Sequence, residues 1–151
     1  MKLNNQDIQR YHRHRFPYLL VDCIEEIEPG KSAQGFKNFS ENEWLFHCNL
    51  HENEPVPYTM LIEVLTEVFL LPILILPGNE GKITNFISAD DANVFRDIYP
   101  GEKLEVTANV KSWRRGIAAG TAEGFIAGEL VCNAKLTFVI PEIMEKYLPQ
   151  K

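Results

Sequence analysis

The sequence predicts an α+β domain in which an antiparallel sheet of about six strands wraps around one long apolar helix. Residues 59–76 place apolar side chains at three- and four-residue spacing and on most outer positions too, which is typical of a helix covered on several sides. The second half of the chain contains long segments of alternating character separated by turn residues, as sequential antiparallel strands do. A curved sheet around the helix satisfies both patterns, and this arrangement is the hotdog fold. We expect residues 1–151 to form one such domain.

The first half of the chain supplies a short helix and a hairpin. Residues 4–12 are predicted as a leading helix capped by Asn4 or Asn5. Residues 18–27 are rich in β-branched and aromatic side chains and are followed by a Pro-Gly turn, so we expect a strand whose hairpin partner is 31–39. Residues 42–50 fit either a helical turn or a loop.

The central helix and four further strands account for most of the rest. Pro57 stands just ahead of the helix at 59–76, and Pro72 is expected to kink it or end its regular part. Strands are predicted at 82–95, 103–113, 116–125 and 129–140.

Composition excludes several classes of function. The net charge is −6, from 15 basic and 21 acidic residues, which argues against nucleic-acid binding as a main activity. The three cysteines are widely spaced and form neither a metal-ligand pair nor a disulfide framework, as expected in a reducing cytosol. The start has no apolar signal-peptide core, and the most apolar stretch is too short and too charged for a membrane span. We therefore expect a cytoplasmic protein without membrane contact.

Three stretches, in order along residues 8–141, resemble a known family. Residues 14–22 (HRFPYLLVD) are similar to the HR(Y/F)P(F/Y)LLVD signature of the β-hydroxyacyl-acyl-carrier-protein dehydratases. The family's KN…NE and xPGDxL…xRRG segments correspond here to 37–38 with 42–43, and to 99–104 with 113–116. The resemblance implies a hotdog protein of fatty-acid or polyketide type metabolism.

The family's active-site segment, NEPFFxGHFPGxPxMPGxLxxEAMAQ, aligns with residues 42–67 without a gap. Glu63 falls on the family's catalytic carboxylate, whereas Asn49 falls on its catalytic histidine. Pro57 falls on the proline before the helix. Cys48 and Tyr58 replace glycines, and Glu67 replaces the closing glutamine.

These replacements alter the expected chemistry. The resemblance implies a histidine base for the α-proton, a glutamate acid for the departing hydroxyl, and a backbone N–H at the helix start that polarises the thioester carbonyl. Glu63 and the N–H of Tyr58 can still serve, but Asn49 cannot accept a proton at a useful pH. His51 and His47 flank Asn49 at about 6–7 Å along an extended chain. Either reaches the site only through a rearranged loop, and the alternative for each is a surface or hydrogen-bonded histidine.

Three functions stay open from the sequence. The favoured one is an acyl-thioester-binding protein of the dehydratase type, with dehydration altered or lost or with His51 or His47 recruited as base. The second is a thioesterase that uses Asn49 and Glu63, because a carboxylate and a helix N–H suffice for hydrolysis. The third is a non-catalytic subunit of a hotdog hetero-oligomer.

Further residues are assigned to substrate and partners on the strength of the resemblance. The candidate substrate-binding residues are Phe46, Cys48, Pro57, Tyr58 and Glu67. Of the two helix carboxylates, Glu67 is a weaker candidate than Glu63, since it could simply reach solvent or a partner chain. Acyl-carrier proteins are acidic, so a docking face should be basic, and the candidates for it are Arg10, Arg13, Arg15, Arg114 and Arg115.

The expected partners are acyl-carrier protein or coenzyme A thioesters and further hotdog chains. A lone hotdog sheet leaves its edge strands uncovered, which favours a homodimer or a higher homo-oligomer such as a trimer of dimers, with a second hotdog subunit as the alternative. The sequence shows no metal-ligand motif and no nucleotide-binding glycine loop, so we expect no cofactor and no metal.

Overall fold

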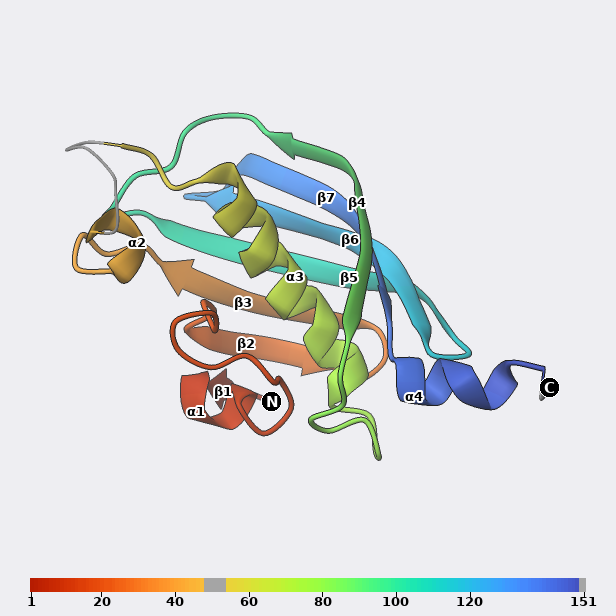
Figure 1. The fold of residues 1–151 in the computed structure, drawn as a ribbon. Coiled ribbons are helices and arrows are strands. Elements are labelled where there is room, and N and C mark those ends of the chain that lie inside the picture. Colours follow the sequence, from red (N-terminus) through yellow and green to blue (C-terminus); the bar gives the residue numbers. More distant parts are fainter. Residues whose placement is uncertain (48–53, 150–151) are drawn as a thin grey trace.

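A computed structural model describes residues 1–47 and 54–149 of the chain. In it a curved antiparallel sheet wraps around one central helix (Figure 1), which confirms the predicted hotdog architecture. The strands are β1 (Leu3–Asn4), β2 (Cys23–Glu28), β3 (Ser32–Asn38), β4 (Asn85–Val94), β5 (Lys103–Arg114), β6 (Ile117–Ile126) and β7 (Glu129–Val139). The helices are α1 (Asn5–Ile8), α2 (Trp44–His47), α3 (Tyr58–Leu74) and α4 (Pro141–Met144), followed by a 3-10 turn at Glu145–Tyr147.

The sheet has the order β1-β2-β3-β5-β6-β7-β4, and the two-residue β1 is the strand that the sequence did not predict. All of its pairs are antiparallel. Strand β4 does not pair with its neighbour in sequence, β5, but lies at the far edge beside β7. The turns between β5 and β6 and between β6 and β7 each contain two residues with positive φ, Arg115-Gly116 and Ala127-Gly128. Such turns match the twist of the strands that they join.

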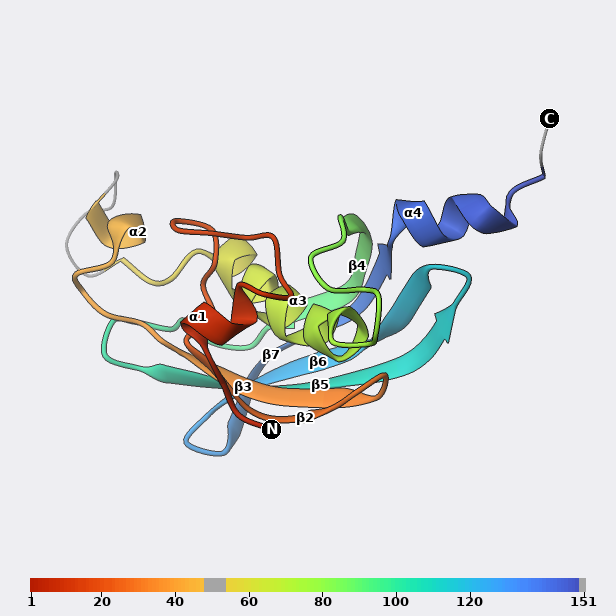
Figure 2. The same cartoon turned by 90° about the horizontal axis from the view of Figure 1, so that it is seen from below.

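Helix α3 lies across the concave face of the sheet, and the sheet curves beneath it in the perpendicular view (Figure 2). Nearly every residue from Leu61 to Leu74 is buried. The helix approaches β6 closely at Gly120, where a Cβ atom would come within 2.7 Å of the Phe69 ring and 2.1 Å of the Asn109 carbonyl oxygen. A bare backbone in this strand therefore lets the apolar helix seat deeply in the sheet.

The C-terminal end of α3 shows what Pro72 does in this helix. The helix continues two residues beyond Pro72, to Leu74, because Leu70–Leu74 are buried and their packing favours the last turn despite the missing N–H. The carbonyl of Pro72 also accepts a hydrogen bond of 2.8 Å from Gly30 N in the β2–β3 turn. None of the helices within the described ranges is long and apolar enough to cross a membrane.

The N-terminal region corrects two predicted boundaries. Helix α1 ends at Ile8 rather than near residue 12, although Asn4 caps it as predicted and forms a reciprocal capping box with Asp7. Strand β2 begins at Cys23, not at residue 18. The segment before β2 is not in the sheet because the backbone N–H groups of Leu20 and Val21 donate to a side chain of α3 instead.

Candidate functional site

The start of α3 is built as the family segment predicts. Pro57 has an extended backbone (φ −56°, ψ 134°) and directly precedes the helix, whose first residue is Tyr58. The Tyr58 side chain is exposed and its hydroxyl donates a hydrogen bond of 2.9 Å to Asp97. Next to this turn is a pocket of about 300 Å³ with a largely apolar wall, lined by Tyr58, Thr59, Ile62, Ala92 and Val94.

Glu63 and Glu67 lie one helical turn apart on α3 but in different surroundings. The Glu63 side chain is 35% exposed, and that of Glu67 is 0% exposed. Oε2 of Glu67 accepts hydrogen bonds from both Leu20 N and Val21 N at 2.9 Å. The possibility that Glu67 reaches solvent is therefore wrong, because its carboxylate is enclosed and binds the segment ahead of β2.

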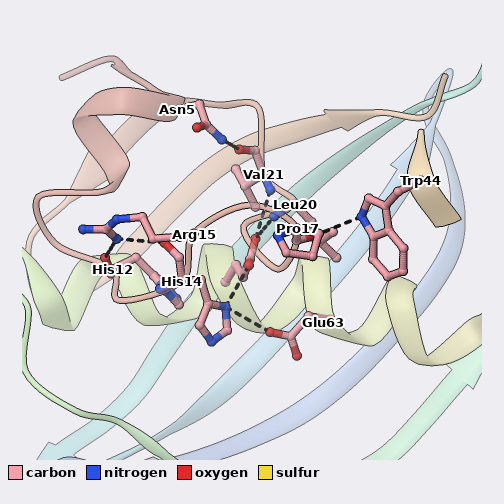
Figure 3. Close-up of polar contacts among 10 residues, drawn as sticks. Asn5, His12, His14, Arg15, Pro17, Leu20, Val21, Trp44 and Glu63 are labelled. Atoms are coloured by element: carbon pink, nitrogen blue, oxygen red, sulfur yellow. Dashed lines mark hydrogen bonds and ion pairs between the residues drawn. The ribbon is translucent and has the colours of Figure 1, made fainter. Parts of the chain in front are cut away.

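His14 contacts both carboxylates (Figure 3). Its Nδ1 lies 3.0 Å from Glu67 Oε1 and 3.4 Å from Glu63 Oε1. The hydrogen bond to Glu67 raises the pKa of His14, with the negative charges of Glu67 and Glu63 acting in the same direction against its partial burial. Burial raises the pKa of Glu63, and the charge of Glu67 raises it further, while His14 lowers it. The site therefore has a histidine and a carboxyl whose pKa values both exceed their ordinary range.

The loop that carries His14 is held by its own polar contacts. The Arg15 guanidinium donates to the carbonyl oxygens of Gln9, His12 and His14 at 2.8–2.9 Å. The His12 ring lies 4.4 Å from the His14 ring, and its Nδ1 accepts a hydrogen bond from His14 N at 3.3 Å. Desolvation, aided by the charges of His14 and Arg15, lowers the pKa of His12 to about 3. His12 is therefore a neutral, buried support for His14.

Other predicted site residues differ in what the structure says of them. Asn49, Cys48 and His51 lie outside the described residues. His47 ends α2, and Phe46 in the same helix is half-buried and packs against the core. Helix α2 is tied to the His14 loop because Trp44 Nε1 donates to the Pro17 carbonyl at 3.1 Å (Figure 3).

The arginines proposed for carrier docking form two groups that lie apart in the fold. Arg10 is within 3.7 Å of Asp7, Arg13 donates to the Gly81 carbonyl, and Arg15 holds its own loop as described above. Arg114 ends β5, and Arg115 lies in the next turn with its guanidinium 5.9 Å from the Tyr147 ring. The docking role of both groups stays a prediction.

Within the described part of the chain, the ligand atoms of His14, Glu63 and Glu67 all lie within 4.8 Å of one another, close enough to hold a metal ion. Hydrogen bonds within the protein already engage both oxygens of Glu67 and the Nδ1 atom of His14. The three side chains accordingly form an acid–base cluster in which His14 contacts both carboxyl groups.

No role for His14 was predicted from the sequence beyond its place in the motif at residues 14–22. One signal was present: the histidine belongs to the motif at 14–22, and Glu67 replaces the family's glutamine. That the His14 and Glu67 side chains meet at 3.0 Å depends on how the loop that carries His14 lies against α3.

The wrapped sheet, with a partly exposed carboxylate on its central helix, defines a hotdog protein. The chain belongs to the family of the FabA-like domain, whose model matches residues 12–135. The chain is 36% identical over 140 residues to a 3-hydroxyacyl-[acyl-carrier-protein] dehydratase FabZ of Bacillus velezensis, covering 93% of this chain and 99% of that one. The FabZ of Bacillus subtilis is 33% identical over 140 residues, with the same coverage.

Solved structures share the fold at low sequence identity. The dehydratase heterocomplex ApeI:P from Xenorhabdus doucetiae superposes with a TM-score of 0.76 at 12% identity, covering 95% of this chain and 97% of that chain. A hypothetical thioesterase protein with coenzyme A from Streptococcus pneumoniae has a TM-score of 0.60 at 13% identity, with coverages of 78% and 83%.

Proposed function

We propose that this protein is a lyase of the dehydratase type that interconverts 3-hydroxyacyl and enoyl thioesters, with Glu63 as the acid. The observation that carries the proposal is the state of Glu63, a partly exposed carboxyl on the central helix whose pKa is raised mainly by burial. A raised pKa keeps the carboxyl protonated over a wider range, as an acid for a departing hydroxyl requires.

The neighbourhood of Glu63 suits a thioester substrate. Tyr58 is the first residue of α3, so no preceding turn of the helix accepts its N–H, which could donate to a thioester oxygen. The apolar pocket beside this turn can receive part of an acyl chain. The pantetheine arm would come from acyl-carrier protein, which the FabZ relatives' names specify, or from coenzyme A.

A thioesterase is the second candidate function. The protonation state of Glu63 distinguishes hydrolysis from dehydration. Hydrolysis would use Glu63 ionised, either as a base for water or as a nucleophile. Its raised pKa opposes that form, so dehydration ranks first and hydrolysis with Asn49 and Glu63 second.

The test is a pair of assays on the purified full-length protein with crotonyl-pantetheine. Hydration removes the enoyl absorbance, and hydrolysis releases a free thiol. We expect hydration without thiol release, and a fall of roughly 10²–10⁴ in rate for Glu63→Gln, because the amide cannot supply the proton. Glu105→Gln, an exposed carboxylate on β5, is the matched control. Thiol release that depends on Glu63 would instead establish a thioesterase. If the protein neither hydrates nor hydrolyses the substrate, the remaining function is that of a non-catalytic subunit.

The assembly is part of the proposal. A homodimer, or a pairing with a second hotdog subunit, would cover the edge of the sheet at β4. Purification from the native source distinguishes the two, since a hetero-oligomer brings a second chain of similar fold.

A further inference from the structure

We infer that His14 is the proton acceptor of this site, in place of the histidine that the family carries at the position of Asn49. The inference rests on the proposed lyase function. It names a base for that function, which the alignment of residues 42–67 with the family does not supply. His14 belongs to the loop between α1 and β2, while Glu63 belongs to α3, and the fold brings their side chains within 3.4 Å. The two residues would thus supply a base and an acid from one chain.

Glu67 orients His14 for this role. The Glu67 carboxylate can only accept hydrogen bonds, so the proton on the His14 ring must sit on Nδ1, 3.0 Å from Oε1. That leaves Nε2 with its lone pair free, and Nε2 makes no hydrogen bond within the described residues. The same division of labour, in which a buried carboxylate fixes the histidine tautomer and supports the imidazolium, is well known from serine hydrolases.

The replacement of the family's glutamine by Glu67 is what makes this arrangement possible. The group at this position receives hydrogen bonds from Leu20 N and Val21 N on one oxygen and from His14 on the other. A glutamine has only one acceptor oxygen. If that oxygen faced the two backbone donors, its NH₂ group would face His14 and donate to Nδ1, which would place the ring proton on Nε2. Glu67 is a positioning residue by this argument.

The protons and electrons of the dehydration balance over a full turnover. Nε2 of His14 takes the α-proton, the electrons of that C–H bond form the carbon–carbon double bond, and the β-carbon–oxygen bond breaks. Glu63 gives its proton to the departing hydroxyl, which leaves as water. Nε2 of the imidazolium then loses its proton to solvent and Glu63 takes up a proton from solvent, since both side chains are partly exposed, and the starting state is restored with the ring proton on Nδ1. Hydration follows the same steps in reverse.

The position of His14 suits contact with substrate. Its side chain is 37% exposed, on the same side as the partly exposed Glu63 and unlike the enclosed Glu67. The Arg15 hydrogen bonds to the carbonyls of His12 and His14 hold the loop in place. A base held in this way does not have to be recruited by a rearrangement of residues 48–53.

The first test compares His14→Gln with His51→Gln and His47→Gln in the crotonyl-pantetheine hydration assay. We expect His14→Gln to lower kcat by roughly 10²–10⁴, because a positioned base is lost. A thermal unfolding midpoint and binding of butyryl-pantetheine, a saturated analogue, verify that the variant folds and holds ligand. Loss of hydration on His51→Gln or His47→Gln while His14→Gln stays active would overturn the inference.

A different pattern identifies failure of the proposed function itself. If the native protein binds butyryl-pantetheine but never hydrates the enoyl thioester, the lyase is wrong before His14 is tested. If hydration is present and His14→Gln leaves kcat unchanged, the lyase stands and His14 is not its base. Asn49→His restores the family's histidine and is a further test. With His14 as the working base, the native protein should hydrate the enoyl thioester without this substitution. Hydration that appears only in Asn49→His would contradict the role of His14.

The second test uses Glu67→Gln and the pH profile of kcat. Within residues 1–47 and 54–149, the titratable and charged groups that face His14 are His12 and Arg15 from its own loop and Glu63 and Glu67 from α3. The Glu67 contact raises the pKa of His14, and the Glu67 charge raises that of Glu63. Activity requires His14 neutral with Nε2 unprotonated and Glu63 protonated, so we expect Glu67→Gln to lower kcat and to move both limbs of the remaining bell to lower pH. A fall in amplitude without movement of either limb would show that Glu67 only stabilises the fold.

Discussion

At the scale of single residues, three neighbouring polar side chains of the candidate site have separate tasks. Glu67 is completely enclosed but accepts hydrogen bonds from two backbone amides and from His14, which offsets the desolvation of its charge. Glu63, one turn away, keeps part of its surface in contact with solvent. His12 is buried and neutral, and serves only to support its neighbour. The separation of buried from accessible groups lets adjacent side chains divide structural and chemical roles.

His12 makes stability depend on pH in a direction that can be measured. Its folded pKa of about 3 lies below the ordinary 6.5, so as the pH falls the unfolded chain takes up a proton that the folded chain does not. Stability should decline from about pH 6.5 downward and level off near pH 3, by an amount on the order of 4–5 kcal/mol. Urea unfolding of the native protein and of His12→Asn, whose Oδ1 can still accept from His14 N, measures this. Parallel pH curves for the two proteins would contradict the buried neutral histidine.

At the scale of elements, α3 depends on the sheet that surrounds it. The helix has no side-chain cap at its start and contains Pro72, so its local sequence contributes little to its ends. Its stability comes from burial of the apolar residues on nearly all sides. The sheet must therefore leave room, and β6 does so with glycines at the closest approach.

Gly120→Ala tests this close packing. The added methyl group would lie 2.1 Å from the Asn109 carbonyl oxygen and 2.7 Å from the Phe69 ring, so the helix or β5 must shift. We expect a loss of roughly 1–3 kcal/mol in the free energy of unfolding. Thr121→Ala, at the adjacent half-exposed position of β6, is the control and should change it by less than about 1 kcal/mol. Equal stabilities for Gly120→Ala and the native protein would show that α3 tolerates displacement from the sheet.

At the scale of the whole molecule, the exposed edge of the sheet is the most conspicuous surface. Strand β4 ends the strand order, and apolar side chains in and beside it are exposed: Phe86, Ile87 and Phe95. An uncovered strand edge with apolar side chains favours pairing with another strand. The C-terminal helix α4 follows β7 and extends away from the sheet (Figure 1).

We expect a homodimer joined through β4. Light scattering after size-exclusion chromatography should give twice the 17.3 kDa mass of the chain. Ile87→Pro should shift the protein toward the monomer, because proline removes a backbone donor from the edge. Ile87 lies at an irregularity in the β4–β7 register, so the change should leave that pairing intact. Ser112→Pro would not serve as a control for Ile87→Pro, because β5 is an interior strand and a proline there would disrupt the sheet itself. A monomeric native protein would contradict the dimer.

The sequence by itself determined the fold class, because an all-round apolar helix and alternating strands have few ways to bury their surfaces together. It also placed β3, α3 and the four later strands within a few residues, and located Glu63 on the helix. Only the tertiary structure decided that β4 crosses to the far edge, that residues 18–22 leave the sheet, and that His14 reaches α3. The physical reason is that hydrophobic periodicity reports which face of an element is buried, whereas contacts between a loop and a helix 53 residues further on depend on buried hydrogen bonds that no local pattern records.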